Sequence, residues 1–157
     1  MSEDLAADSE RPPARPHRSA RRKARKYALD ILFAADLREE DPAAMLAAEV
    51  FTTQEPPPPY SRALVEGVAA RQADLDAAVS THLAKGWTLE RMPRVDRCLA
   101  RLAVFEFTCL DVPADVAIAE AAALAAELST EASPGFLSGV LGAVAKDRLG
   151  PAPAETA

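Results

Sequence analysis

The sequence predicts an all-α fold of six to seven helices in two packed helical subdomains. Apolar residues recur at intervals of three and four along most of the 157-residue chain, which is the spacing of one helix face. Alanine is abundant and aromatic residues make up only 5% of the chain, a composition that favours closely packed helices. No stretch alternates between apolar and polar residues, and the sequence contains no Asn-Gly turn, so no β-hairpin is predicted.

Capping residues, prolines and glycines set the helix boundaries. Asp41-Pro42 and Ser133-Pro134 each pair a helix-capping side chain with a proline suited to the first turn. The QEPPPPY segment predicts a stiff polyproline connector. Gly86 is expected to end the long helix that follows, with Trp87 folded back over its last turn. The expected helices lie at residues 19–37, 42–51, 61–83, 94–109, 113–128 and 133–149.

These helices fall into two groups, at residues 19–84 and 93–150, between a disordered leader at 1–18 and a disordered tail at 151–157. No apolar run approaches the roughly 20 residues of a membrane span, and no signal peptide is visible. A cytoplasmic protein that binds no membrane is therefore expected.

The sequence gives no sign of catalytic or metal chemistry. Cys98 and Cys109 lie eleven residues apart in one expected helix, or about 16 Å, which is too far for a disulfide. No cofactor, no metal set and no catalytic residues are predicted. Glu106 lies inside an apolar run and requires a partner, for which a structural ion pair or hydrogen bond is the favoured interpretation.

Positive charge is concentrated at the start of the first helix. Residues 11–26 carry eight Lys or Arg and no acid, whereas the whole chain has a net charge of −6. Cations at a helix N-terminus oppose the helix dipole, so helix stability does not account for them. The spacing of Arg18, Arg21, Arg22 and Arg25 places four guanidinium groups on one face, next to Lys23 and Lys26.

This basic stripe allows three interpretations: a solvated N-terminus, a nucleic-acid site or a site for an acidic protein. Arginine suits phosphate because its planar fork binds two oxygens. No helix-turn-helix pattern accompanies the stripe, and aromatic residues follow at Tyr27 and Phe33, which favours RNA over DNA. The arginines at 91, 94, 97 and 101 either extend this surface or pair with nearby acids.

Three stretches carry a resemblance to a known family. They are ARRKARKYALDILFAADL, RMPRVDRCLARLAVFEF, and DVPADVAIAEAAALAAELS followed by SPGFLSGVLGAVA. In this order and spacing the chain resembles the NusB family of bacterial transcription antitermination factors. The resemblance covers about residues 19–148. It departs from the family pattern at Ala119, Ser138 and His82.

The resemblance implies a function without catalysis. Members of this family bind single-stranded boxA RNA of ribosomal RNA transcripts together with NusE, a small-subunit ribosomal protein, and reach RNA polymerase through other Nus factors. By the same resemblance the family's RNA-binding start falls on Arg21, Arg22, Lys23 and Arg25, and Lys26 extends it here. Phe33, Lys85 and Phe136 match further RNA-binding positions. Asp96 matches a carboxylate near the RNA and NusE surface.

Two alternatives remain open at this point. Some proteins that resemble this family form homodimers which hide the arginine surface, so a self-associating module is possible. A similar helical module also occurs in RNA cytosine methyltransferases, although this chain contains no nucleotide-binding glycine loop.

Overall fold

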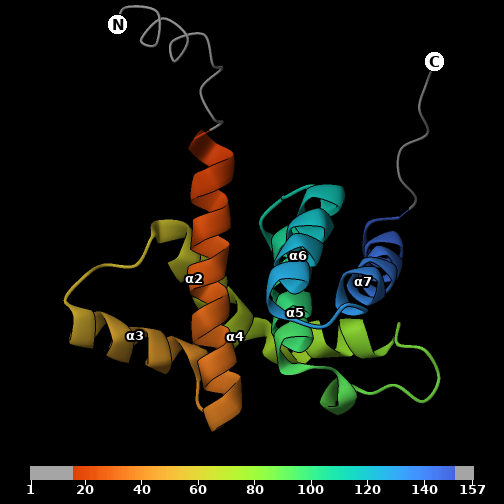
Figure 1. Cartoon of the computed structure of the whole chain (residues 1–157), viewed down its shortest axis with the longest axis horizontal. Helices are drawn as coiled ribbons and strands as arrows, with labels where there is room; N and C mark the ends of the chain where they lie inside the picture. Colours follow the sequence, from red (N-terminus) through yellow and green to blue (C-terminus); the bar gives the residue numbers. More distant parts are fainter. Residues whose placement is uncertain (1–15, 151–157) are drawn as a thin grey trace, which may run out of the picture.

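The computed structural model describes residues 16–150, with side chains from Ala20 onward, and this part of the chain contains helices and no strand (Figure 1). The predicted all-α fold is therefore confirmed. The expected tail and residues 1–15 of the expected leader lie outside the described residues. Residues 16–18, also assigned to the leader, belong instead to the first helix. The elements are α2 (Pro16–Arg38), α3 (Pro42–Thr53), α4 (Pro59–Ser80), the 3₁₀ turn η1 (Leu89–Arg91), α5 (Arg94–Cys109), α6 (Ala114–Leu128) and α7 (Ser133–Leu149).

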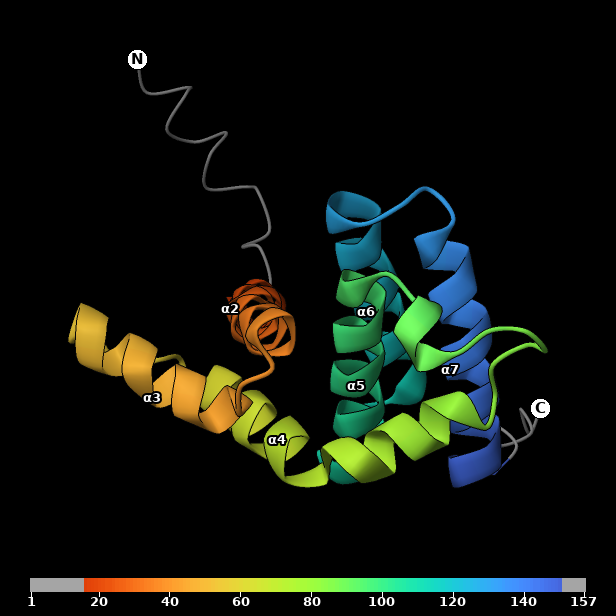
Figure 2. The ribbon, with the colours of Figure 1, turned by 90° about the horizontal axis from the view of Figure 1, so that it is seen from below.

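Helix α5 lies at the centre and packs against α2, α4, α6 and α7. Figure 2 shows α5, α6 and α7 side by side, α4 crossing below them, and α2 and α3 on the opposite side from α7. Because ion pairs join the end of α5 to the start of α2, and the start of α5 to the end of α2, these two helices run antiparallel. The cationic start of α2 thus lies beside the end of α5 and along α6 from Glu120 to Glu127.

The observed helix boundaries follow the local sequence signals in part. Asp41 caps α3 by accepting a hydrogen bond from the Ala43 N–H at 3.3 Å. Helix α4 is kinked at Arg71, whose φ of −119° and ψ of 15° leave the helical region, so the long helix is interrupted. Ser133 does not cap α7: it is the first helical residue, and its hydroxyl accepts from the Thr130 N–H in the preceding turn.

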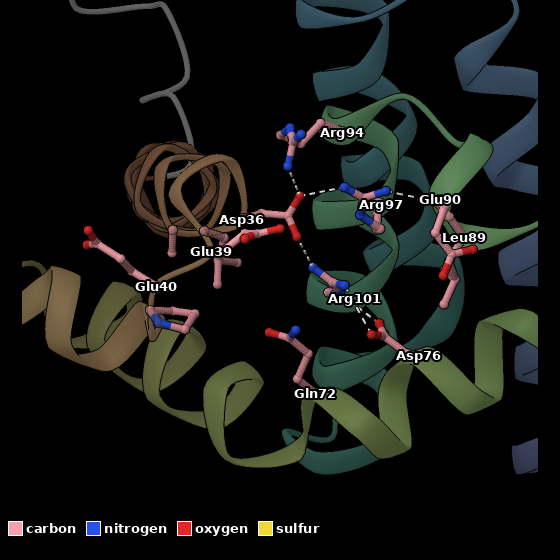
Figure 3. A pocket seen from close by; sticks show the side chains of 13 residues that line it. Asp36, Glu39, Glu40, Gln72, Asp76, Leu89, Glu90, Arg94, Arg97 and Arg101 are labelled. Carbon is pink, nitrogen blue, oxygen red and sulfur yellow. Dashed lines mark hydrogen bonds and ion pairs between the residues drawn. The ribbon is translucent and has the colours of Figure 1, made fainter.

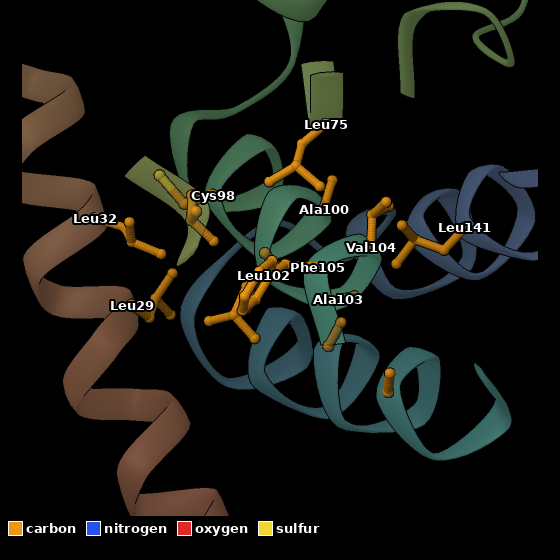
Figure 4. Packing of buried hydrophobic residues seen from close by; sticks show 14 of the residues in the cluster. Leu29, Leu32, Leu75, Cys98, Ala100, Leu102, Ala103, Val104, Phe105 and Leu141 are labelled. Carbon is orange, nitrogen blue, oxygen red and sulfur yellow. The ribbon is translucent and has the colours of Figure 1, made fainter. Parts of the chain in front are cut away.

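The core is one continuous cluster of small and aliphatic side chains that extends from α2 through α5 to α7 (Figure 4). Every residue of α5 from Cys98 to Phe107 is buried, so α5 is covered on all sides. Gly67 of α4 permits the closest contact, because a Cβ there would lie 1.9 Å from the ring of Phe105. The glycines of α7 differ, because at Gly139 and Gly142 a Cβ would meet nothing within 4 Å.

The two cysteines behave as expected for separate thiols. Cys98 is buried, Cys109 is exposed, and neither forms a disulfide. Among the helices of residues 16–150, none has the length and apolar character needed to cross a membrane.

Candidate nucleic-acid interface

The start of α2 presents four exposed cations, Arg21, Arg22, Lys23 and Lys26. The fifth described cation of this segment, Arg25, is only 4% exposed. The predicted stripe is therefore divided, because Arg25 points toward the neighbouring helices whereas Arg21 and Arg22 remain exposed to solvent. Arg18 lies within α2, but its side chain is not among those described.

Arg25 belongs to a buried network with α5 and α4. Its Nε and Nη2 groups donate to both carboxylate oxygens of Glu106, at 2.8–3.0 Å, and Tyr60 donates its hydroxyl to the same carboxylate. Burial alone would lower the pKa of Arg25, but the hydrogen bonds and charge of Glu106 outweigh it and raise the pKa. Contact of Arg25 with RNA stays a prediction that its burial disfavours, because its guanidinium is enclosed by Glu106 and, at 3.8 Å, by Glu120.

Two of the exposed cations pair with carboxylates of α6. Arg22 binds Glu120 through two hydrogen bonds of 3.1 and 3.2 Å, and Lys26 binds Glu127 at 3.0 Å. The hydrogen bond to Glu120 raises the pKa of Arg22. Both cations keep about half of their side-chain surface exposed, at 53% and 49%. Each can therefore take a second anionic partner on its open side, at the cost of weakening the first.

Arg21 and Lys23 form no ion pair with any of the described residues. The guanidinium carbon of Arg21 lies 3.9 Å from the centre of the Tyr60 ring, in a cation–π contact. Arg21 also borders a groove of about 430 Å³ beside the connection between α5 and α6. Among the described cations at the start of α2, these two therefore carry the positive charge that the carboxylates of α6 do not neutralise.

The aromatic residues of α2 are mostly occupied by the core. Tyr27 and Phe33 are both partly buried and pack against the apolar cluster. Stacking of a base on Phe33 remains a prediction and is restricted to the part of the ring that reaches the surface.

Lys85 and Phe136 lie away from the start of α2. Lys85 is exposed in the connection between α4 and α5, which lies on the α7 side of the molecule, across α5 from α2 (Figure 2). Phe136 of α7 packs against Trp87, with ring centres 5.5 Å apart. Trp87 thus contacts α7, and the guanidinium carbon of Arg91 lies 5.6 Å from the centre of its ring. The structure does not gather these residues with the α2 cations, and their contact with the same RNA remains a prediction.

Asp96 is buried in the structure. It is 1% exposed, and it accepts a 2.6 Å hydrogen bond from Ser129 in the turn between α6 and α7. Its carboxylate therefore faces inward and fixes that turn to the start of α5, and direct binding of a partner by Asp96 stays a prediction that this burial disfavours.

Three of the four arginines at 91–101 pair with acids, as one of the two interpretations expected. Figure 3 shows Asp36 of α2 facing Arg94, Arg97 and Arg101 of α5, with N···O distances of 2.6, 2.6 and 3.0 Å. Arg101 also binds Asp76 of α4 at 2.7 Å. Burial would raise the pKa of Asp36, but the hydrogen bonds from Arg97 and Arg101 outweigh it and lower the pKa. This cluster therefore joins α2, α4 and α5 instead of extending the basic surface.

Three functional contacts were not expected from the sequence. They involve Tyr60, which directly follows a run of prolines, and the acids Glu120 and Glu127, which lie seven residues apart on α6. The seven-residue spacing of the acids was a usable signal, because it places both on one helix face. The role of Tyr60 depends on where α4 crosses α2, which the local sequence does not encode.

Comparison with known proteins gives a consistent result. A family model described as "NusB family" matches residues 22–146. The chain is 52% identical over 131 residues to the transcription antitermination protein NusB of Salinispora tropica, covering 81% of this chain and 96% of that protein. It is also 52% identical over 126 residues to the protein of that name from Cutibacterium acnes. That match covers 80% of this chain but spans about half of the relative's length, 48%.

Solved structures of similar fold agree with these relatives. NusB of T. maritima matches with a TM-score of 0.73 and 30% identity, over 82% of this chain and 92% of that chain. A crystal structure of antitermination factors NusB and NusE in complex with dsRNA contains a chain that matches with a TM-score of 0.72 and 25% identity, over 82% and 98% of the two chains.

Proposed function

The chain belongs to the NusB family, and from this premise we propose that it is a transcription antitermination factor that binds single-stranded boxA RNA of ribosomal RNA transcripts together with NusE. It acts by binding rather than by catalysis. Support comes from relatives that carry this name at about half sequence identity, and from a similar solved chain found with NusE and RNA. We place this activity in the cytoplasm, on nascent transcripts that other Nus factors link to RNA polymerase.

One observation carries the placement of RNA on this chain. The exposed cations at the start of α2 project from a protein whose net charge is −6. An anionic surface elsewhere repels a polyanion and favours contact at this one place. We assign phosphate contacts to Arg22, Lys23 and Lys26. Arg25 is excluded from this set because Glu106 encloses it.

The salt dependence of RNA binding tests this assignment. Each phosphate contact to a single strand contributes about 0.7 to the slope of log K against log salt. Lys23→Gln should weaken binding of a boxA RNA and reduce the slope by about that amount. Arg38→Gln is the matched control, since Arg38 is an exposed cation at the other end of the same helix. It should leave both affinity and slope unchanged.

The role of the partner is measured in the same titrations with NusE added. We expect NusE to increase the RNA affinity of the wild-type protein and of Arg38→Gln. In the presence of NusE, Lys23→Gln should still bind RNA more weakly than either of them. Equal binding by all three proteins would remove the α2 surface from the RNA site. A homodimer that persists in saturating boxA RNA, measured by light scattering, would instead favour a self-associating module.

A further inference from the structure

The position of Arg21 differs from that of its neighbours in the basic segment. Arg22 and Lys26 are held at their charged ends by carboxylates of α6, whereas Arg21 is held by the face of an aromatic ring. A guanidinium carbon 3.9 Å from a ring centre lies at the contact distance of carbon atoms, about 3.5–4.0 Å. The guanidinium therefore covers the face of Tyr60, and Arg21 as a whole remains exposed.

The ring beneath Arg21 is itself fixed. Tyr60 donates its hydroxyl to Glu106, and Glu106 is held by Arg25 through three further hydrogen bonds. Burial, together with the hydrogen bond to Glu106, raises the pKa of Tyr60 to about 12. The hydroxyl thus keeps its proton across the physiological range, and the ring cannot swing away without breaking a buried contact.

A groove opens beside this stack. Its volume is about 430 Å³, and it lies between the start of α2 and the segment that joins α5 to α6. The α5–α6 side is largely apolar, with Val116 left 42% exposed to solvent. The groove is lined by Arg21, Arg25, Glu120, Leu110, Asp111, Val112, Pro113 and Val116.

We propose that Arg21, held against Tyr60, is a stacking platform for one unpaired RNA base that enters the groove beside the α5–α6 connection. This inference rests on the proposed function. Unpaired bases in RNA complexes stack on guanidinium planes as well as on aromatic rings, and a flat, preordered surface loses little entropy on binding. The apolar wall of the groove suits the opposite side or edge of the base. Arg21 then contacts a base plane, while its neighbours contact phosphates.

A double-mutant cycle between protein and RNA tests the stack. A series of boxA RNAs is made in which one nucleotide at a time lacks its base but keeps its phosphate. For wild-type protein, one position should lose affinity by at least about fivefold, the loss expected for a single stacked base. For Arg21→Lys, which keeps the charge but not the plane, the same RNA should bind as well as the intact one.

Arg22→Lys is the matched control, since it makes the same change one residue away at a position bound to Glu120. It should retain the fivefold sensitivity to the missing base. Tyr60→Phe keeps the ring and should retain that sensitivity too, whereas Tyr60→Leu should lose it. Circular dichroism checks that each variant is folded. If Tyr60→Leu does not fold, the comparison of Arg21→Lys with Arg22→Lys decides the test.

The outcomes separate this inference from the function on which it rests. If wild-type protein binds boxA RNA and Lys23→Gln reduces the salt slope, the proposed function stands. If under those conditions no base position couples to Arg21, the stacking platform is wrong. Absence of any RNA binding by wild-type protein, with or without NusE, would overturn the proposed function itself.

Discussion

Glu106→Gln is the substitution to which the fold should be most sensitive. The side chain of Glu106 is fully buried, Arg25 is 4% exposed, and the three hydrogen bonds between them measure 2.8–3.0 Å. Glutamine has nearly the same shape but removes the negative charge, so the buried guanidinium keeps only its longer contact with Glu120, at 3.8 Å. Loss of one member of a buried pair costs about 3–5 kcal/mol. That is a large part of the roughly 5–15 kcal/mol by which domains are stable.

Glu127→Gln provides the matched control for this prediction. It is the same substitution, and Glu127 also pairs with a cation of α2, but both partners are about half exposed. Exposed pairs contribute about 0–1 kcal/mol. Urea titration followed by circular dichroism measures the free energy of unfolding of both variants. If Glu106→Gln costs no more than Glu127→Gln, the reasoning from burial is refuted.

A double variant separates the charge from the packing. In Arg25→Met with Glu106→Leu both charges are removed, and apolar side chains of comparable length fill the site. Replacing both members of a buried pair is often neutral or stabilising, so much of the loss should be recovered. The hydroxyl of Tyr60 loses its acceptor in this variant, which limits the recovery. Recovery would identify the stranded charge as the cause of the cost in Glu106→Gln.

Three further outcomes follow from packing and titration. In urea titrations, Gly67→Ala should destabilise the protein by about 1–3 kcal/mol, because its Cβ would lie 1.9 Å from an aromatic ring. Gly139→Ala has open space around it and should stabilise α7 by up to about 1 kcal/mol. The lowered pKa of Asp36 gives stability that is complete above about pH 4 and is lost as the pH falls below it, so Asp36→Asn should flatten the acid limb of a pH series of unfolding free energies. A thiol reagent should modify Cys109 in the folded protein and Cys98 only on unfolding, because Cys98 is buried and burial raises its pKa to about 12; rapid labelling of both would contradict the packing.

The helices themselves could be predicted from the sequence because their signals are local. The apolar period, the Asp41-Pro42 pair and Gly150 act within one or two turns, and α5 was expected at the residues where it is observed. The stop of α4 was less accurate, since the helix ends at Ser80 rather than Leu83. Helix ends fray by a residue or two, and no single residue between Ser80 and Gly86 enforces the stop.

The candidate site was predictable only in outline. Charge density identified the start of α2, but it could not separate buried cations from exposed ones, because that depends on which helix face meets α4, α5 and α6. Arg25 and Arg22 lie three residues apart, yet one is enclosed by Glu106 and the other is half exposed. Asp96 shows the same limit: a carboxylate in the first turn of a helix looks like a surface residue until the turn at Ser129 is placed over it.

The carboxylates of α5 and α6 also explain how so many cations persist where the helix dipole opposes them. Arg25 pairs with Glu106 of α5, whereas Arg22 and Lys26 pair with Glu120 and Glu127 of α6. Each of these cations therefore faces a carboxylate of a neighbouring helix. The positive charge at the start of α2 therefore has two roles. Part of it is structural and docks α2 onto the body, and only the remainder is available to an external anion. Phosphate must then compete with Glu120 for Arg22, whereas at Lys23 it meets no described competitor. This difference makes Lys23 the cleaner probe of RNA contact, and it predicts that the effects of substitution along the segment will not follow charge alone.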